Sequence, residues 1–517
     1  LALTVRETLS RGLLVVYSLA TSVDYVCVIQ SCELDSPMKG STAVIRCQAY
    51  TKFPDGFTFG VATAAHQIEG AWDVNADFTN GDIACDSYNR YQEDVAELDY
   101  LGVDFYRFSL SWSRILPTGR IDHINPDGIR YYNDLLDALA AKNIEPLVTL
   151  FHWDLPQSLQ DLGGWANPKM VDYFRDYSDV CFREFGDKIK SWITFNEPYE
   201  ICEDGYGDEK KAPAIDSHGV GNYLCSDTLL KAHAEAYHLY NETYRSKQNG
   251  KIMISINSIW YEPKDPENAQ QVTLAETANQ FKFGWFAHPI FAEKGGYPEV
   301  MVANVAAQSK GEGLARSRLE QFDDYWIERI KGTSDFLGIN HYTTFLVTSP
   351  GVDPTAKSPS WLKDIGAVVP SGFANLLRWC KKSYNDPLIY ITENGFSDRG
   401  TLEDYGRISY YNVSRLNSHL KPYWERFGFY YVNITDPARP RTPKLSAEYY
   451  KQLIANRELP QDEKFKAPSV SSLTYFEDVE QVSIVAPVLM TSSKRILAET
   501  RAQLLVVRLF TLLKLYL

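Results

Sequence analysis

The sequence predicts one α/β domain built as a (β/α)8 barrel that is incomplete around the eighth strand. Between Phe53 and Leu453, a short apolar run is repeatedly followed by a polar or glycine turn and then by a longer segment with helical spacing. This alternation is typical of βαβ units in a parallel sheet. The run Leu147–Phe151 is continuous and apolar, as expected of a strand covered on both faces.

Seven strands and two well-marked helices follow from this pattern. Gly128–Lys142 and Lys169–Phe185 carry apolar residues three and four positions apart, which predicts helices, and Asn125 is placed to cap the first of them. The predicted strands are Phe59–Thr63, Asp104–Ser109, Pro146–Phe151, Ser191–Phe195, Lys251–Ile256, Phe336–Ile339 and Leu388–Thr392.

The bulk composition bounds the function. The chain has 517 residues, 44% of them hydrophobic, and a formal net charge of −14. Nucleic acid is excluded as a partner, because binding it needs clustered Lys and Arg. The 8 Cys are too sparse for a disulfide framework and show no zinc spacing, so no metal or other cofactor is implied. Cys202 and Cys225 flank a glycine-rich segment and fit either a loop disulfide or two buried thiols.

The two ends of the chain differ from its middle. Residues 1–50 form an N-terminal extension, 51–455 the barrel domain and 456–517 a C-terminal extension. Gly12–Ala20 resembles the apolar part of a signal peptide but is too short to span a bilayer, and a mis-assembled upstream segment fits equally well. The tail from Leu504 reads as an interfacial helix or a non-native extension. Sequons at Asn241, Asn412 and Asn433 are compatible with an extracellular location.

Two predicted strands each end in a carboxylate. Glu197 follows Ser191–Phe195, and Glu393 follows Leu388–Thr392. Polar residues at the carboxyl ends of barrel strands point into the active-site mouth. A pair of carboxylates there suits glycoside hydrolysis, with retention if they lie about 5 to 5.5 Å apart and inversion if the gap is wider. The alternative is that each is one more solvated acid among the 66 Asp and Glu.

Six ordered motifs extend this interpretation, each at a predicted strand end. Together they resemble glycoside hydrolase family 1, the family of β-glucosidases, lactase-type enzymes and myrosinases, over roughly 400 residues as one barrel. The motifs are Phe57-Thr-Phe-Gly-Val-Ala-Thr-Ala-Ala-His-Gln-Ile-Glu-Gly70, Tyr106-Arg-Phe-Ser-Leu-Ser-Trp-Ser-Arg114, Leu150-Phe-His-Trp-Asp-Leu-Pro156, Thr194-Phe-Asn-Glu-Pro198, Gly338-Ile-Asn-His-Tyr-Thr343 and Ile391-Thr-Glu-Asn-Gly395.

The resemblance implies a retaining β-glycosidase that acts by double displacement, with Glu197 as acid/base and Glu393 as nucleophile. Arg107 and Tyr342 match residues that contact the nucleophile, and Tyr342 also matches a substrate contact. The remaining matched positions hold the sugar whose bond is cut: Gln67, His152, Trp153 and Asn196. His152 by itself would read as a core histidine.

Several other residues in the motifs invite a functional interpretation. Trp112 and Trp165 fit an aglycone channel, although core packing is the better interpretation for Trp112. Glu69 and Asp154 match positions without a catalytic role. The two remaining motif histidines have no metal-ligand spacing, and they are His66 and His341.

The sequence also departs from the family. Arg407–Lys421 is too short for a helix and a strand, so the eighth strand and its sugar-reading motif are absent, and a second gap lies between Trp72 and Gly81. Trp424 and Glu425 follow that motif's place and do not replace it. We therefore expect exposed edges on the first and seventh strands unless Phe427–Val432 pairs with them, and weak or absent activity. The alternative function is a non-catalytic sugar-binding or receptor-like member of the family, or an inactive splice product of it.

Overall fold

The computed structural model describes residues 28–34, 45–50, 52–53, 55–70, 84–347, 371–394, 428–433 and 436–458. They belong to two compact units. The first contains an antiparallel hairpin of β1 (Val28–Leu34) and β2 (Ile45–Tyr50), and a bridge between Lys52 and Glu458. The second unit contains the barrel sheet and every predicted site residue. Both predicted terminal extensions lie largely outside the described residues.

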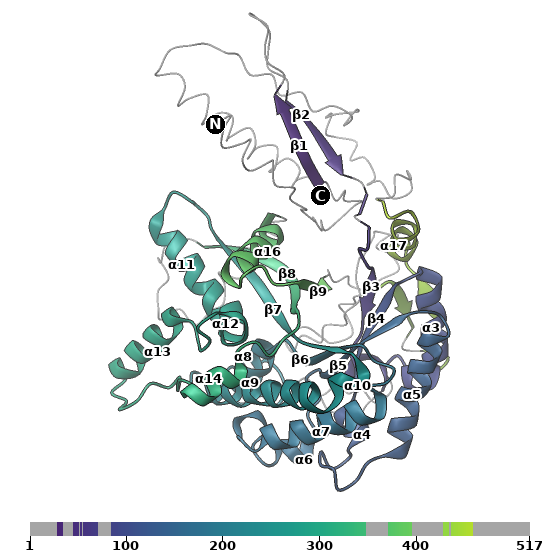
Figure 1. The fold of residues 1–517 in the computed structure, drawn as a ribbon, viewed down its shortest axis with the longest axis horizontal. Coiled ribbons are helices and arrows are strands. Elements are labelled where there is room, and N and C mark those ends of the chain that lie inside the picture. The colour runs from purple at the N-terminus through teal and green to yellow at the C-terminus, as the bar shows by residue number, and fades with distance from the viewer. Residues whose placement is uncertain are drawn as a thin grey trace, which may run out of the picture. The chain divides into compact units, whose positions relative to one another are not determined.

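The second unit is organised around a seven-stranded, wholly parallel sheet in the order β3-β4-β5-β6-β7-β8-β9 (Figure 1). All seven predicted strands are confirmed, most of them within one or two residues. The strands are β3 (Gly60–Ala62), β4 (Phe105–Ser109), β5 (Glu145–Phe151), β6 (Ser191–Asn196), β7 (Lys251–Pro263), β8 (Leu337–Val347) and β9 (Ile389–Asn394).

Strands β7 and β8 run further than predicted. The predicted strands end at Ile256 and Ile339, yet the polar residues Asn257, Ser258 and His341 lie inside a ladder that continues to Pro263 and Val347. Their polar groups pair across the two strands: Ser258 Oγ donates to the Asn340 carbonyl at 2.9 Å and lies 3.0 Å from His341 Nδ1. A polar strand end is stable because each group finds a partner.

The sheet curves round but is not closed by backbone pairing within the described residues. No ladder there joins β9 to β3. The side chain of Arg107, on β4, nevertheless reaches the Thr392 carbonyl on β9 at 3.1 Å. The shortened segment Arg407–Lys421 lies outside the described residues. Residues 430–432 form β10 (Tyr430–Val432), which pairs with β11 (Arg441–Pro443) in a separate antiparallel ribbon instead of with β3 or β9.

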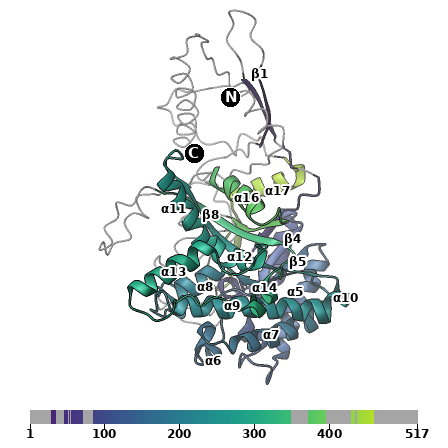
Figure 2. The same cartoon turned by 60° about the vertical axis from the view of Figure 1, so that its left-hand side comes forward.

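Helices cover the outside of the sheet, as the βαβ pattern predicts. Helix α5 (Pro126–Ala140) starts where Asn125 Oδ1 accepts the Asp127 N–H at 3.1 Å, so the predicted cap is confirmed. Helix α7 (Met170–Phe185) confirms the second predicted helix and packs against α9 (Gly221–Leu239), which lies beside it in both views (Figures 1 and 2).

The other described helices fill the connections between strands. None of the described helices is long and apolar enough to cross a bilayer. They are α2 (Ala65–Ile68), α3 (Ser87–Leu101), α4 (Trp112–Ile115), α6 (Gln157–Gln160), α8 (Pro198–Tyr206), α10 (Arg245–Gln248), α11 (Ala269–Asn279), α12 (Trp285–Phe291), α13 (Glu299–Gly311), α14 (Asp324–Ile330), α16 (Ser371–Ser383) and α17 (Leu445–Asn456), with the short helical turns η1 (Gly164–Ala166), η2 (Tyr240–Tyr244) and η3 (Gln280–Gly284).

An aromatic core lies behind β5 and β6. Trp112 stacks on Tyr177 with ring centroids 4.5 Å apart, and Trp165 meets Phe151 edge-on at 5.3 Å. The exposed fractions of the two tryptophans are 0% and 1%. The predicted core role of Trp112 is thus confirmed. The aglycone interpretation of Trp165 is wrong, because this ring is enclosed by other aromatic side chains.

Candidate active site

Glu197 lies at the junction between β6 and α8. Its backbone is left-handed, with φ 49°, and Pro198 follows as the first residue of the helix. A left-handed φ is uncommon for a residue with a side chain, and such strain gathers at functional sites. The Glu197 amide donates to the Ser255 carbonyl of β7 at 2.8 Å. The side chain is buried, so this turn aims a carboxyl group into the interior at the end of β6.

Glu393 is on β9 and is equally enclosed. Arg107 Nη1 donates to Glu393 Oε1 at 2.6 Å, and the Tyr342 hydroxyl donates to Glu393 Oε2 at 2.6 Å. Each carboxylate oxygen therefore has its own donor, and one donor is charged. The two predicted contacts to this residue are both present in the structure. A charge-assisted bond of this length is the stronger class of hydrogen bond.

One residue outside the predicted site, Asn340 of β8, contacts Glu197 and the strand that carries Glu393. Its Nδ2 donates to Glu197 Oε1 and to Asn196 Oδ1, each at 3.0 Å. Its Oδ1 accepts from Ser255 Oγ at 2.8 Å and from Thr392 Oγ1 at 2.7 Å, the latter one residue before Glu393. The only sequence signal for it is its place in the Gly338–Thr343 motif.

The Asn196 amide completes the link between the acids. Its Oδ1 accepts from Arg107 Nη2 at 2.6 Å, while Arg107 Nη1 binds Glu393. The Asn196 Nδ2 lies 3.0 Å from His152 Nε2. The predicted residues Arg107, Asn196, Glu197 and Glu393 therefore form one hydrogen-bonded group, together with His152 and Asn340.

His152 is neutral at this position. Burial, followed by the positive charge of Arg107, holds the pKa of its imidazole well below the usual range. A neutral ring accepts from Asn196 at Nε2 and carries its proton on Nδ1. That buried Nδ1 has no hydrogen-bond partner among the described residues, so it is free to contact a bound hydroxyl group. The interpretation of His152 as a satisfied core histidine is therefore not supported.

Two more residues predicted to contact the sugar are Trp153, which is bonded to this group, and Gln67, which lies at the turn after β3. Trp153 follows His152 with a left-handed φ of 76°, and its Nε1 donates to the Asn196 carbonyl at 3.0 Å. Gln67 is buried on α2, directly after β3. The predicted site residues therefore lie within or directly after β3, β4, β5, β6, β8 and β9, with Arg107 inside β4 and Tyr342 inside β8.

Glu69 lies in a separate buried cluster. The Tyr132 hydroxyl donates to its carboxylate at 3.0 Å, and Arg114 Nε donates to it at 3.0 Å. Burial raises the pKa of Glu69 to about 7 despite these contacts. Arg114 belongs to α4 and Tyr132 to α5, so Glu69 links the end of α2 to these two helices. This structural role agrees with the expectation that Glu69 is not catalytic.

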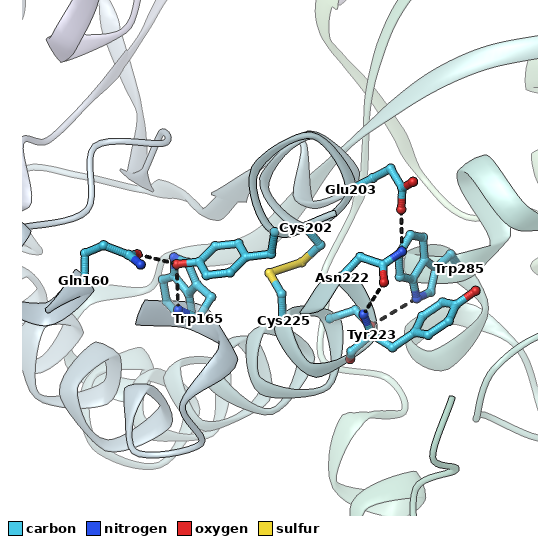
Figure 3. The surroundings of a disulfide bond; sticks show 10 residues. Gln160, Trp165, Cys202, Glu203, Asn222, Tyr223, Cys225 and Trp285 are labelled. Carbon is cyan, nitrogen blue, oxygen red and sulfur yellow. Dashed lines mark hydrogen bonds between the residues drawn. A yellow bond between two sulfur atoms is a disulfide. The ribbon is translucent and has the colours of Figure 1, made fainter. Parts of the chain in front are cut away.

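Helix α8, which begins directly after Glu197, is joined to α9 by the Cys202–Cys225 disulfide (Figure 3). The two Cα atoms are 5.3 Å apart and both residues are fully buried. The disulfide interpretation of these cysteines is thus confirmed. Asn222 of α9 also donates to Glu203 of α8, as Figure 3 shows, so the helix that carries the acid at its start is held along one side.

Comparison with known proteins agrees with this geometry. The chain matches the model of glycosyl hydrolase family 1 over residues 49–421 and 414–459. The chain belongs to glycosyl hydrolase family 1. Among solved family 1 structures, aphid myrosinase superposes with a TM-score of 0.72 at 41% identity, covering 78% of this chain and 99% of that one. The β-glucosidase from Thermotoga maritima gives a TM-score of 0.67 at 32% identity, covering 80% of this chain and 99% of the other.

Curated family 1 relatives are similar over the same region. Myrosinase 1 of Brevicoryne brassicae is 42% identical, with 78% of this chain and 98% of that protein covered. The lactase/phlorizin hydrolase of Rattus norvegicus is 43% identical over 78% of this chain, which spans only 24% of that larger protein. The predicted family and barrel fold are confirmed by these matches.

Proposed function

We propose that this family 1 chain is a retaining β-glycosidase that hydrolyses terminal β-glucosides or related glycosides, with Glu393 as nucleophile and Glu197 as acid/base. The observation that carries the proposal is the different environment of the two acids. Glu393 accepts from a guanidinium and a phenol hydroxyl, whereas Asn340 donates a neutral amide hydrogen bond to Glu197. Guanidinium pairing suits a carboxylate that attacks as an anion, and an amide contact is compatible with a carboxyl group that gains and loses a proton.

The reaction then proceeds in two steps. Glu393 attacks the anomeric carbon while Glu197 gives its proton to the leaving oxygen, which forms a glycosyl-enzyme ester and frees the aglycone. Glu197, now a carboxylate, takes a proton from water as that water cleaves the ester. We assign His152 Nδ1, Asn196 and Gln67 to the sugar hydroxyls, and we assign the Trp153 ring, whose single N–H donates to the Asn196 carbonyl, to apolar contact with the sugar.

The linkage that best fits this site is an O-glycosidic bond. An alkoxide leaving group needs a proton in the transition state, whereas a thiolate leaves without one. The buried Glu197 supplies that proton. Myrosinase 1 and the lactase/phlorizin hydrolase are both relatives of this chain, so rates on matched O- and S-aryl β-glucosides test the choice.

Labelling identifies the nucleophile. A 2-deoxy-2-fluoro β-glucoside with an activated leaving group should add one fluoroglucosyl group to Glu393, and peptide mass spectrometry locates it. Glu393→Gln should show neither label nor turnover. Glu197→Gln should still be labelled, and azide should restore its turnover of an activated substrate because azide needs no general base. A label on any other residue would refute the assignment, and sugar binding without turnover by the unchanged chain would favour a non-catalytic role.

We also propose that the chain matures in an oxidising compartment, as the predicted extracellular location requires. The buried Cys202–Cys225 disulfide supports this, because such bonds persist in secreted proteins and are rare in the cytosol. Peptide mass spectrometry of the protein from its natural source, without reductant, should find the two cysteines crosslinked and the exposed sequon at Asn241 glycosylated. Two free thiols would contradict the proposal.

A further inference from the structure

A group of buried charged side chains lies next to the candidate active site and takes no part in the proposed chemistry. Lys211 forms ion pairs with Glu200 and, at 3.1 Å, with Asp204, while Lys282 lies 3.1 Å from the other Glu200 oxygen. The exposed fractions of these side chains are between 5% and 14%. Burying ions is costly, and such pairs often add little stability over apolar residues, so a buried cluster calls for another role.

Lys211 also contacts the wall of the active site. Its Nζ lies 4.3 Å from the centroid of the Trp153 ring, within the range of a cation–π interaction. The same indole donates through Nε1 to the carbonyl of Asn196, the residue before Glu197. Lys211 therefore contacts Trp153, whose indole N–H orients the peptide group between Asn196 and Glu197.

The other contacts of Lys211 are with residues that follow Glu197 in the chain. Glu200 and Asp204 lie four residues apart on α8, so they share one face of the helix that starts directly after Glu197. The Lys211 amide donates to the Asp204 carbonyl at 2.9 Å, which fixes the loop to the helix. Asn257 of β7 donates to Glu200 at 2.7 Å and ties this face of α8 to the sheet.

We propose that Lys211 is a positioning residue for the acid/base: by holding Trp153 on one side and Glu200 with Asp204 on the other, it fixes the backbone that aims the Glu197 carboxyl at the leaving oxygen. This inference rests on the proposed function. Without the ammonium group, Glu200 and Asp204 each lose an ion pair while Lys282 remains on Glu200, so α8 is held less firmly beside Trp153. The disulfide keeps α8 attached to α9, so the expected result is a displaced acid and not an unfolded domain (Figure 3).

The dependence on the leaving group separates positioning of the acid from a general structural role. The dinitrophenolate of a 2,4-dinitrophenyl β-glucoside leaves without a proton, whereas the alkoxide of an alkyl β-glucoside must be protonated as it leaves. We expect Lys211→Met to lower kcat/KM for the alkyl glucoside by on the order of 100-fold and to change the dinitrophenyl value by less than about 3-fold. Lys211→Arg, which keeps the charge and the ring contact, should recover at least about a tenth of the alkyl-glucoside rate.

The control variant is Lys210→Met, the neighbouring lysine, whose side chain is 49% exposed and pairs with Asp208. It should leave both rates unchanged. Equal losses on the two substrates in Lys211→Met would show a structural role and overturn the inference, as would wild-type rates on both. If the unchanged chain hydrolyses neither substrate, the proposed function fails instead.

A binding measurement keeps the inference testable when turnover is slow. An imidazole-fused glucose analogue accepts a hydrogen bond from the acid/base, whereas a basic iminosugar pairs with the nucleophile. Calorimetry should show that Lys211→Met binds the imidazole-fused analogue at least about 10-fold more weakly than the unchanged chain does, because one hydrogen bond to a charged group is lost. Its affinity for the iminosugar should equal that of the unchanged chain. Equal affinities for the first compound would overturn the inference. If the unchanged chain binds neither compound, the inference falls together with the proposed function.

Discussion

Arg107 Nη1 lies 2.6 Å from Glu393 Oε1, in an ion pair whose side chains are 1% and 2% exposed and whose partners are 286 residues apart in sequence. The same guanidinium binds Asn196 through Nη2 and the Thr392 carbonyl through Nη1. One side chain from β4 therefore joins the strand that carries the proposed nucleophile to the strand that leads to the proposed acid/base.

Removal of Arg107 should reduce the stability of the fold. Arg107→Met leaves Glu393 as a buried carboxylate without its cation, which should cost about 3–5 kcal/mol in the free energy of unfolding. Urea denaturation followed by circular dichroism measures this. Arg90→Met is the control, because the Arg90–Glu93 pair has side-chain exposed fractions of 25% and 53% and should contribute about 0–1 kcal/mol. Equal losses in the two variants would contradict the prediction.

Tyr342→Phe should act mainly on rate. It removes one hydroxyl donor, 2.6 Å from Glu393 Oε2, and leaves the ring in place. A hydrogen bond to a charged group contributes about 1.5–3 kcal/mol, so kcat/KM should fall by about 10- to 100-fold. Steady-state kinetics with an aryl β-glucoside tests this, with Tyr325→Phe, whose side chain is 62% exposed, as the control. An unchanged kcat/KM in Tyr342→Phe would show that the hydroxyl does not assist the reaction.

Glu69 should make stability depend on pH. Its pKa is raised from 4.5 to about 7 by burial, so between these values the folded chain binds more protons than the unfolded chain. Stability therefore decreases as pH rises through this window, by at most about 1.4 kcal/mol per pH unit from this group. Denaturation midpoints between pH 4.5 and 7 should show a smaller decrease in Glu69→Gln than in the unchanged chain. Glu93→Gln, at an exposed position, should follow the unchanged chain. Identical slopes for all three proteins would contradict the prediction.

The disulfide between α8 and α9 should stabilise the folded state. It closes a loop with a sequence separation of 23 residues, which corresponds to about 3 kcal/mol in the chain-entropy model. The double substitution of Cys202 and Cys225 by Ala should lower the free energy of unfolding by about that amount. Cys85→Ala removes a cysteine that forms no disulfide and serves as control. A double variant as stable as this control would indicate that other contacts hold the two helices together.

The strands and the two acids were predictable because each rests on a local pattern. A run such as Ser191–Phe195 is apolar and ends in a polar turn, and the order of such runs fixed the order of the parallel sheet. The lengths of β7 and β8 were not predictable, since Ser258 and His341 are polar and become strand residues only by pairing with each other. Strand length there depends on a neighbour more than 80 residues away.

The network around the acids was only partly predictable. Residues with a family match, such as Arg107 and Tyr342, were found, whereas Asn340 was noted in its motif without a role. Lys211 and Glu200 gave no signal, because their pairing depends on how the loop after α8 folds back on that helix. Sequence spacing carries no information about such a contact.

In many enzymes, residues selected for catalysis make the fold less stable. Here the Arg107–Glu393 ion pair joins β4 to β9, on the side of the sheet where β9 and β3 do not pair within the described residues. Selection that preserves catalytic turnover would therefore also preserve this contact between the two strands. A descendant that lost Glu393 alone would bury an unpaired guanidinium, so we expect these two positions to change together in relatives that have abandoned catalysis.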